Sequence, residues 1–496
     1  MMNINPSLKD FTRLTKKHNL IVLSHKFYSD SLTPVSIYHS LTKKLKSESF
    51  LLESVEGEEK ISRFSFLGFM PICTFKSKDK KIYINEQKEI TFNTEKEPLF
   101  ELKKLMQKFK VAPKENLRFF GGFVGYLGYD LIRFYEPIGP KQKDVLNTFD
   151  TYLVLPKFLI IFDHLQKQIE ILNFVSVKTS KNLKNIYNNE KKAVEQVFAQ
   201  IMNSDKLEAL SLISPKKIKF KSNLSKKDFL AKVRKAKEYI KDGEIIQTVF
   251  SQRFSLEFKG EPFNVYRYLR LINPSPYMFY LNFKDVQIAG SSPEMLLRCE
   301  KNTLITRPIA GTRKRGKDDS QEKELENSLL ADPKERAEHI MLVDLARNDV
   351  GRVSESASIK VPIFMTIEKF SHVMHIVSEV RGELKKGKDI FSAFESCFPA
   401  GTLSGAPKVR AMQIINELEE ETRGIYGGSV GYFSFTNSLD TCIIIRTVIF
   451  KNNKAYVQAG AGIVMDSDPL SEYKETLNKA KAQLLAVALA ANANVR

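Results

Sequence analysis

The sequence predicts a mixed α/β fold of the α+β type, in which strand-rich and helix-rich stretches follow one another. Residues 53–66, 74–84 and 154–175 show the alternating or β-branched patterns that are typical of strands. From Asp228 onward, longer helical patterns alternate with strands to the end of the chain. Apolar residues make up 43% and charged residues 27% of the sequence, which is the balance of a globular protein.

These changes of pattern predict three parts of the 496-residue chain. Residues 1–175 form a strand-rich N-terminal domain. Residues 176–227 are rich in Lys, Asn and Ser and form a basic connector, with one helical stretch at 191–202. Residues 228–496 form the C-terminal domain, which opens with a helix at 229–240 and continues with strands at 248–258 and 278–283.

The composition argues against several classes of protein. No apolar run approaches the roughly 18 residues of a membrane-spanning helix, and residues 1–10 lack the apolar core of a secretion signal. The four cysteines show no C-x-x-C spacing, so neither a zinc site nor a disulfide framework is expected. The net charge of +19 favours anionic partners, but no stacking aromatics are interleaved with the lysines. We predict a cytoplasmic protein that binds no nucleic acid.

One short segment occurs twice. Residues 121–126 (GGFVGY) match residues 427–432 (GGSVGY). Neither copy is a phosphate-binding loop, because no Gly-Lys-Ser/Thr follows. Chance and a repeated turn at the entry to a strand both explain the match.

Two predicted helix starts carry the same pair of glutamates. Asp332-Pro333 and Asp468-Pro469 each place an N-cap residue before a proline at the first helical position. The pairs that follow are Glu335 with Glu338 and Glu472 with Glu475. Residues three apart lie on one face of a helix, so each pair projects in one direction. Either pair alone is typical of a solvated helix start; together they suggest a shared carboxylate site that suits Mg²⁺.

Three further features have two interpretations when the pattern alone is considered. Residues 460–462 (Gly-Ala-Gly) offer backbone N–H groups at close approach, but they also fit a plain strand-to-turn glycine pair. Arg446 lies in an otherwise apolar predicted strand, 442–450, where it is either exposed at an edge or held for an anion. His375 lies in the apolar run 373–377, which is more typical of a core histidine than of a catalytic one.

An ordered series of motifs runs along the C-terminal half. In chain order they are residues 290–294, 307–312, 335–339, 344–349, 371–373, 398–408, 426–428 and 460–462. They cover roughly residues 228–485 without a gap. This series resembles the chorismate-utilising enzymes, and the large subunits of anthranilate synthases in particular. The resemblance implies the chorismate-binding fold, a large sandwich of antiparallel sheets flanked by helices.

The resemblance also implies roles for the residues of the site. Glu338 and Glu475 are expected to bind Mg²⁺ directly, with Glu335 and Glu472 in the same acidic cluster. The expected catalytic residues are His375, Glu294, Thr402 and Gln247. The expected substrate contacts are Gly311, Thr312, Tyr426, Arg446, Gly460, Ala461 and Gly462.

Individual chemical roles follow from the same resemblance. Arg446, with Tyr426 beside it, is expected to bind the enolpyruvyl carboxylate of chorismate. Glu294 is expected to act as general acid on the departing C4 hydroxyl, for which its pKa must be raised by apolar surroundings. His375 is expected to face the substrate ring, with Thr402 nearby. The implied reaction is attack of ammonia at C2, loss of the C4 hydroxyl, and elimination of pyruvate.

Two positions indicate which relative the chain resembles most. Relatives that add water carry a lysine base where this chain has Gln247, and a neutral amide cannot deprotonate water. Aminodeoxychorismate synthases typically carry a lysine where this chain has Ala310, which leaves room for ammonia at C2. The sequence therefore favours anthranilate formation, with aminodeoxychorismate synthase component I as the alternative. A basic RNA-binding protein is the non-enzymatic alternative, and the acidic helix pairs disfavour it.

A regulatory site and a partner are also implied. Residues 51–54 and 273–278 resemble the two halves of a tryptophan feedback site, in which Ser54, Pro276, Tyr277 and Met278 contact the inhibitor. The sequence shows no amidotransferase segment with a Cys nucleophile and a His-x-Glu partner. Ammonia is therefore expected either from solution or from a separate glutamine amidotransferase subunit. We predict a complex with such a subunit, a heterotetramer.

Overall fold

The computed structural model describes residues 2–54, 63–86, 88–112, 118–177, 182–204, 207–211, 218–370 and 373–493. Of the motifs named above, Ser371 and His372 lie outside these residues. No helix in the described part of the chain is long and apolar enough to cross a membrane. All four cysteines are buried as free thiols.

The strands of the structure are short to medium in length. They are β1 Ile4–Asn5, β2 Leu20–Tyr28, β3 Ser49–Glu53, β4 Phe64–Lys78, β5 Lys81–Asn85, β6 Glu89–Asn93, β7 Gly122–Leu127, β8 Thr151–Asp163, β9 Gln168–Ser176, β10 Lys221–Ser222, β11 Gln247–Glu257, β12 Tyr277–Asn282, β13 Gln287–Ser292, β14 Met295–Glu300, β15 Thr303–Thr306, β16 Ile309–Lys314, β17 Lys360–Lys369, β18 Val373–Glu383, β19 Gly405–Ala406, β20 Ser429–Ser434, β21 Leu439–Ile443, β22 Thr447–Lys451 and β23 Lys454–Ile463.

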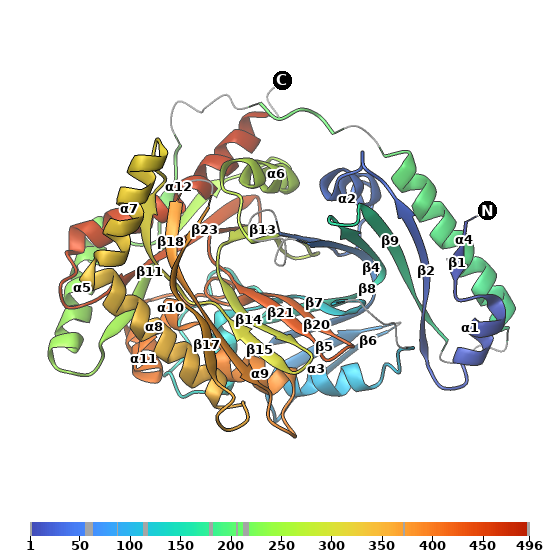
Figure 1. Cartoon of the computed structure of the whole chain (residues 1–496), viewed down its shortest axis with the longest axis horizontal. Coiled ribbons are helices and arrows are strands. Elements are labelled where there is room, and N and C mark those ends of the chain that lie inside the picture. Colours follow the sequence, from blue (N-terminus) through green and yellow to red (C-terminus); the bar gives the residue numbers. More distant parts are fainter. Residues whose placement is uncertain are drawn as a thin grey trace.

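The helices lie mainly outside these strands. They are α1 Leu8–Leu14, α2 Pro34–Thr42, α3 Pro98–Gln107, α4 Leu183–Met202, α5 Lys226–Lys241, α6 Pro262–Ile272, α7 Asp319–Ala331, α8 Pro333–Gly351, α9 Ile390–Cys397, α10 Gly401–Ser404, α11 Lys408–Leu418 and α12 Pro469–Ala493, with a 3₁₀ helix at Tyr129–Phe134. Figure 1 shows α5, α7 and α8 at one end of the molecule and α1 and α4 at the other, with strands between them.

Hydrogen bonds join the strands into one antiparallel system. Consecutive hairpins account for much of it, such as β4–β5, β8–β9 and β12–β13. Two pairings connect the N-terminal part of the chain to the C-terminal part, β3 with β12 and β7 with β20. Strands from before and after the predicted connector therefore belong to the same sheet. The boundaries of the three predicted parts stay a prediction.

The repeated segment has a structural explanation. Its two copies form β7 and β20, which pair with each other so that Gly125 lies opposite Gly431. A Cβ atom at Gly125 would lie 2.0 Å from the Tyr152 carbonyl oxygen, and one at Gly431 would lie 2.0 Å from the Asp440 carbonyl oxygen. Both positions require glycine because neighbouring strand backbones leave no space for a side chain.

The predicted elements differ from the observed ones mainly at their ends. The predicted strands 74–84 and 154–175 are each two strands of a hairpin, because turns at 79–80 and 164–167 interrupt them. The predicted strand 53–66 contains the end of β3 and the start of β4, and residues 55–62 between them lie outside the described part. The helix predicted at 191–202 starts earlier, at Leu183, where the Asn182 side chain caps it.

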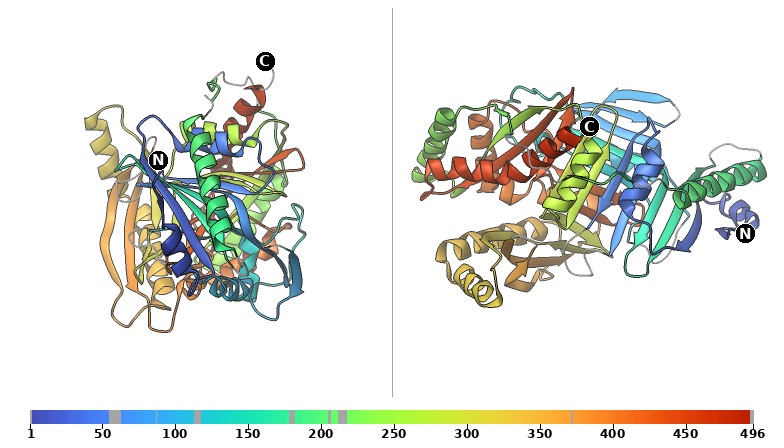
Figure 2. Two further views of the ribbon diagram at one scale, coloured as in Figure 1. Left: turned by 90° about the vertical axis from the view of Figure 1, so that its right-hand side faces the viewer. Right: turned by 90° about the horizontal axis from the view of Figure 1, so that it is seen from above.

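Two large apolar clusters hold the layers together. One fills the space between strands such as β7, β8, β20 and β21 and includes side chains of α3 and α9. The other packs β2, β8, β9 and β23 against α2, α4, α6 and α12. Seen from above, the gold segment with α7 lies opposite the red helix α12 at one end of the molecule (Figure 2). The residues of the predicted site come from these two sides.

Candidate active site

The two acidic helices start as the sequence predicts. Asp332 Oδ1 accepts hydrogen bonds from the backbone N–H groups of Lys334 and Glu335, at 3.0 and 3.2 Å, at the start of α8. Asp468 Oδ1 accepts one from the Ser471 N–H at 2.8 Å at the start of α12. These caps fix where each helix begins, so the two glutamates that follow lie in its first turns.

The structure brings the glutamates of both helices together. Burial raises the pKa of Glu338, and the charge of Glu335 on the same helix and that of Glu475 on α12 raise it further. Burial also raises the pKa of Glu472, with a further contribution from Glu475. Lys479 opposes both shifts. The negative charges of the two helices therefore oppose one another, and a bound cation would relieve this repulsion.

The donors fit a magnesium ion that is bound in part by other ligands. Glu338 is half-buried and Glu475 is exposed, so both can be reached from solvent. Within the described ranges, no three His, Cys, Asp or Glu side chains already form a cluster that could hold a metal ion. Mg²⁺ usually takes one or two carboxylates, with water and substrate oxygens completing its octahedron. The assignment of Glu338 and Glu475 as ligands therefore stays a prediction with a compatible donor set.

Arg446 occupies a different position from the one predicted. It does not lie within a strand, because β21 ends at Ile443 and β22 begins at Thr447. Its φ of 52° is left-handed, a conformation that non-glycine residues adopt rarely and that is found often at functional sites. Its Nη1 donates a hydrogen bond to the Lys479 carbonyl oxygen at 2.6 Å. The guanidinium is thereby tied to α12, the helix that carries Glu475.

Tyr426, the predicted partner of Arg446, lies near it, and Gly460 lies against Tyr426. Burial lowers the pKa of Arg446, while the nearby Tyr426 and Glu475 act in the opposite direction. A Cβ atom at Gly460 would lie 2.9 Å from the Tyr426 hydroxyl oxygen, so glycine allows that close approach. Gly460, Ala461 and Gly462 lie within β23, paired with β11, and not at a turn.

His375 is half-buried and has one defined tautomer. Its Nδ1 lies 2.7 Å from the Gly311 carbonyl oxygen and 3.1 Å from Thr312 Oγ1. A carbonyl oxygen only accepts hydrogen bonds, so Nδ1 carries the proton. Burial lowers the pKa of His375 and the charge of Arg446 lowers it further. His375 therefore differs from an ordinary core histidine. It contacts Gly311 and Thr312, two predicted substrate contacts, and lies near Arg446, a third.

Glu294 has the environment that a general acid requires. It is buried, and burial raises its pKa to about 7, against smaller opposing effects of Thr402 and Lys479. Glu294 and Thr402 line a cavity of about 40 Å³ together with apolar side chains of α8 and β14. Part of the population of Glu294 is thus protonated at neutral pH.

The two positions that distinguish the relatives also lie in this region. Gln247 is buried at the start of β11, and its amide lies beside Glu338 and favours the ionised carboxylate. A Cβ atom at Gly462 would lie 2.6 Å from Gln247 Nε2. Ala310 is buried in β16 and pairs with Ile376, the neighbour of His375. Gln247 therefore lies beside a predicted magnesium ligand, and Ala310 lies on the strand next to that of His375.

A second, smaller pocket contains the predicted feedback residues. Ser54, Pro276, Tyr277 and Met278 all line a cavity of about 60 Å³. They meet because β3 pairs with β12, with Glu53 opposite Met278. Ser54 Oγ is buried and has no hydrogen-bond partner among the described residues. A buried hydroxyl without a partner is a suitable hydrogen-bonding group for a ligand.

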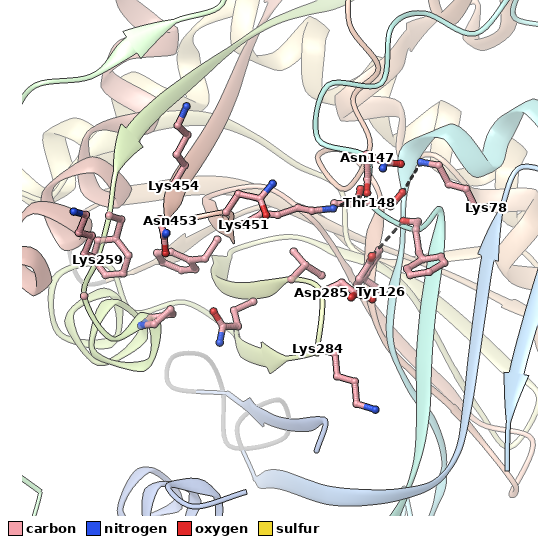
Figure 3. A pocket seen from close by; sticks show the side chains of 18 of the residues that line it. Lys78, Tyr126, Asn147, Thr148, Lys259, Lys284, Asp285, Lys451, Asn453 and Lys454 are labelled. Carbon is pink, nitrogen blue, oxygen red and sulfur yellow. Dashed lines mark hydrogen bonds between the residues drawn. The ribbon is translucent and has the colours of Figure 1, made fainter. Parts of the chain in front are cut away.

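A larger hollow, of about 750 Å³, lies elsewhere. Several lysines line it, but Lys78, Lys284 and Lys454 each form an ion pair with a carboxylate. Figure 3 shows Lys259, Lys284 and Lys454 extending in different directions, so their charges do not converge on one point. None of the predicted site residues lines this hollow.

Sequence reasoning missed Lys479. Its Nζ lies 2.5 Å from Glu475 Oε1 and donates to the Gly460 carbonyl oxygen at 3.1 Å. Its own carbonyl oxygen accepts from Arg446. The available signal was its spacing: Lys479 follows Glu475 by four residues, one helical turn further along the same face of α12.

Comparisons with known proteins identify the family of the chain. The family model described as chorismate binding enzyme matches residues 47–485. Anthranilate synthase component 1 from Aquifex aeolicus is 46% identical over 492 residues, 99% of each chain. The protein of the same name from Bacillus subtilis is 40% identical over 498 residues, 99% of this chain and 96% of that one.

Solved structures show the same architecture. Anthranilate synthase component I from Streptococcus pneumoniae superposes with a TM-score of 0.77 at 39% identity, covering 86% of this chain and 93% of that one. A menaquinone-specific isochorismate synthase from Escherichia coli shares the fold, with a TM-score of 0.73 at 20% identity over 97% and 98% of the chains. The chain therefore belongs to the chorismate binding enzyme family, among the anthranilate synthase component 1 proteins.

Proposed function

We propose that the protein is the large subunit of an anthranilate synthase, a lyase of aromatic amino acid and tryptophan biosynthesis. It converts chorismate and ammonia into anthranilate, pyruvate and water. The observation that supports this choice of reaction is the buried Gln247 amide beside Glu338. A neutral amide cannot accept a proton from water, so hydration of the ring is disfavoured, and Ala310 leaves space for ammonia.

The residues of the chain divide the work of this reaction. Arg446 and the Tyr426 hydroxyl bind the enolpyruvyl carboxylate, and Gly460 lets Tyr426 approach. Glu294, protonated in part at neutral pH, gives a proton to the C4 hydroxyl as it leaves as water while ammonia forms its bond to C2. The unprotonated Nε2 of His375 is available to assist the elimination of pyruvate, which makes the ring aromatic.

Glu338 and Glu475 would hold Mg²⁺, with Glu335 and Glu472 supporting it. The ion, when bound, anchors and polarises the ring carboxylate of chorismate. Two carboxylates on separate helices support this proposal, because their mutual repulsion decreases when a cation binds between them. The Lys479 ammonium, which pairs with Glu475, offsets part of this negative charge.

We further propose that ammonia comes from a glutamine amidotransferase subunit in a cytoplasmic heterotetramer. The name component 1, carried by relatives that match almost the full length of the chain, supports a multi-subunit enzyme. Tryptophan is the proposed feedback inhibitor, bound in the pocket of Ser54, Pro276, Tyr277 and Met278. The unpartnered Ser54 hydroxyl supports a polar ligand there.

The test supplies chorismate, Mg²⁺ and ammonium to the purified chain and follows the fluorescence of anthranilate. We expect turnover that requires both Mg²⁺ and ammonium. Accumulation of aminodeoxychorismate without anthranilate would instead identify an aminodeoxychorismate synthase component I. Formation of isochorismate without added ammonium would show that Gln247 does not exclude hydration.

A further inference from the structure

We propose that Arg423 is a positioning residue for the predicted active site, an inference that rests on the proposed function. Arg423 lies in the segment between α11 and β20, and only 2% of its surface is exposed. Its guanidinium forms a buried ion pair with Glu419, in which Nε and Nη2 donate to the two carboxylate oxygens at 2.8 Å each. Such a pair is a weak source of stability, because both charges lose their hydration. Its other contacts indicate a role in arranging the site.

One of these contacts holds the segment that carries Thr402. Arg423 Nη1 donates a hydrogen bond to the Leu403 carbonyl oxygen at 2.7 Å. Leu403 follows Thr402, whose side chain opposes the raised pKa of Glu294. Both residues belong to α10, which has only four residues and is therefore too short to be stable by itself. The guanidinium thus fixes the predicted catalytic residue Thr402 through the backbone of its neighbour.

A second set of contacts holds β11 at two positions. Nη2 of the guanidinium donates to the Val249 carbonyl oxygen at 2.6 Å. The carboxylate of the pair accepts hydrogen bonds from the N–H group and the hydroxyl of Ser251, at 2.9 and 2.7 Å. On β23, Val249 lies opposite Gly462 and Ser251 lies opposite Gly460. The ion pair therefore holds the strand that supports two of the predicted substrate contacts.

Tyr426 is held by the same residue. Its N–H donates to the Arg423 carbonyl oxygen at 3.2 Å, and the guanidinium carbon lies 5.7 Å from the centre of its ring. A guanidinium over an aromatic face is attracted to it. The direction of the Tyr426 hydroxyl, which is proposed to bind the enolpyruvyl carboxylate, therefore depends on Arg423.

The geometry of these contacts requires a guanidinium. Its three nitrogens donate in different directions within one plane, to Glu419, Leu403 and Val249. An ammonium carries all its donors on a single nitrogen and cannot reproduce this fork. Arg423→Lys therefore keeps the charge but loses part of the network.

The experiment compares two variants of the pair with the wild type. One is Arg423→Lys. The other is the double variant Arg423→Met with Glu419→Gln, which leaves no unpaired charge and keeps an amide oxygen as acceptor for Ser251. Arg253→Lys is the matched control, because Arg253 is also buried on β11 and forms an ion pair with a glutamate, but lies opposite Gln458, outside the predicted site.

For each protein, we would measure kcat and KM for chorismate from pH 6 to 9 with Mg²⁺ and ammonium, and follow thermal denaturation. In both variants of the pair, KM should rise by at least about fivefold, the value of one hydrogen bond to the substrate. The alkaline decrease of kcat should also move to higher pH, by about 0.5 or more, because a displaced Thr402 no longer opposes the raised pKa of Glu294. Arg253→Lys should retain the wild-type KM and pH profile.

A purely structural role would give a different result. It would lower the unfolding temperature and the amount of active protein, which reduces the apparent kcat but leaves KM and the pH profile unchanged. Wild-type KM and pH profile in a folded variant of the pair would therefore overturn the positioning role and leave the proposed function intact.

The remaining outcomes are also decisive. If the wild type forms no anthranilate, the proposed function is wrong, and the inference is wrong with it. If Arg423→Lys does not fold, the double variant decides. If neither folds, the pair maintains the fold and not the site, which would overturn the proposal.

Discussion

The Nδ1 atom of His375 lies 2.7 Å from the carbonyl oxygen of Gly311, on the neighbouring strand of the sheet. This contact determines which nitrogen of the ring bears the proton, and burial together with Arg446 keeps the pKa of the ring low. Nε2 of the neutral imidazole is therefore an acceptor, and the left-handed φ of 67° at Gly311 directs its carbonyl oxygen toward the ring.

The first prediction concerns His375→Asn. The asparagine amide can still donate to Gly311, so the fold should remain, but it offers no basic nitrogen. We expect kcat for anthranilate formation to fall by about 10²-fold or more, the usual contribution of a general acid–base group. His18→Asn, in the turn after α1, serves as control. A kcat for His375→Asn within a factor of two of wild type would show that His375 only holds β16 in place.

The second prediction concerns the pH dependence of turnover. Glu294 must be protonated to act as an acid, and its pKa is raised to about 7. The protonated fraction falls as pH rises through that value, so kcat should decrease on the alkaline side with an apparent pKa near 7. In Glu294→Gln the rate should be low at every pH and this decrease should be missing. A pH–kcat profile of Glu294→Gln with the same alkaline decrease would assign it to another group.

The third prediction concerns stability and follows from the same shift. A carboxyl group with a raised pKa in the folded state stabilises the fold below its unfolded pKa of about 4.5, and this contribution is lost as pH rises toward about 7. Glu294→Gln removes the cost of burying the anion. At pH 8 the free energy of unfolding of the variant should therefore exceed that of wild type by up to about 3 kcal/mol, so the variant should unfold at a higher temperature. Below pH 4 the difference should disappear, as thermal denaturation at both pH values can show.

The fourth prediction concerns magnesium. Glu338→Gln and Glu475→Gln each remove one charge from the paired helices, and we expect each to raise the Mg²⁺ concentration for half-maximal activity by at least about tenfold. Glu324→Gln, on the exposed surface of α7, is the matched control and should behave as wild type. Mg²⁺ titrations of activity check this. If both site variants gave the same Mg²⁺ titration curve as the wild type, the metal assignment would be wrong.

The fifth prediction concerns feedback inhibition. Ser54→Ala removes a buried hydroxyl that has no partner in the described part of the protein. We expect tryptophan inhibition to weaken by about two- to tenfold, the value of one hydrogen bond, while turnover without tryptophan is retained. Ser77→Ala removes a similar unpartnered hydroxyl on β4, outside the pocket. Equal inhibition constants for wild type and Ser54→Ala would remove Ser54 from the inhibitor site.

Much of the local structure could be predicted because its causes are local. The caps at Asp332 and Asp468 involve groups within three residues of each other, so spacing alone reveals them. The glutamate pairs follow from helical geometry for the same reason. The sequence does not reveal the hairpin at residues 154–175. Its two strands look like one apolar stretch, because the turn between them carries few of the residues that mark turns.

The position of Arg446 shows the limit of such reasoning. In the sequence it interrupts an apolar run that fits a single strand of ten residues or so. In the structure β21 pairs with β14 and β20, whereas β22 pairs with β13 and β23. The chain passes from one set of partners to the other at residues 444–446, and the break therefore depends on strands that are distant in the sequence.

By itself, the sequence determined the family, the mixed fold, the acidic helix starts and the identity of the residues at Gln247 and Ala310. Only the tertiary structure decided that Glu475 on one acidic helix influences Glu338 on the other, that Glu294 is buried enough to have a pKa near 7, and that Arg446 lies between two strands. The physical reason is that burial, electrostatic coupling and strand register arise from contacts between distant segments. A local sequence pattern specifies a side chain and the face of the helix or strand on which it lies, but not the residues that it contacts in the folded protein.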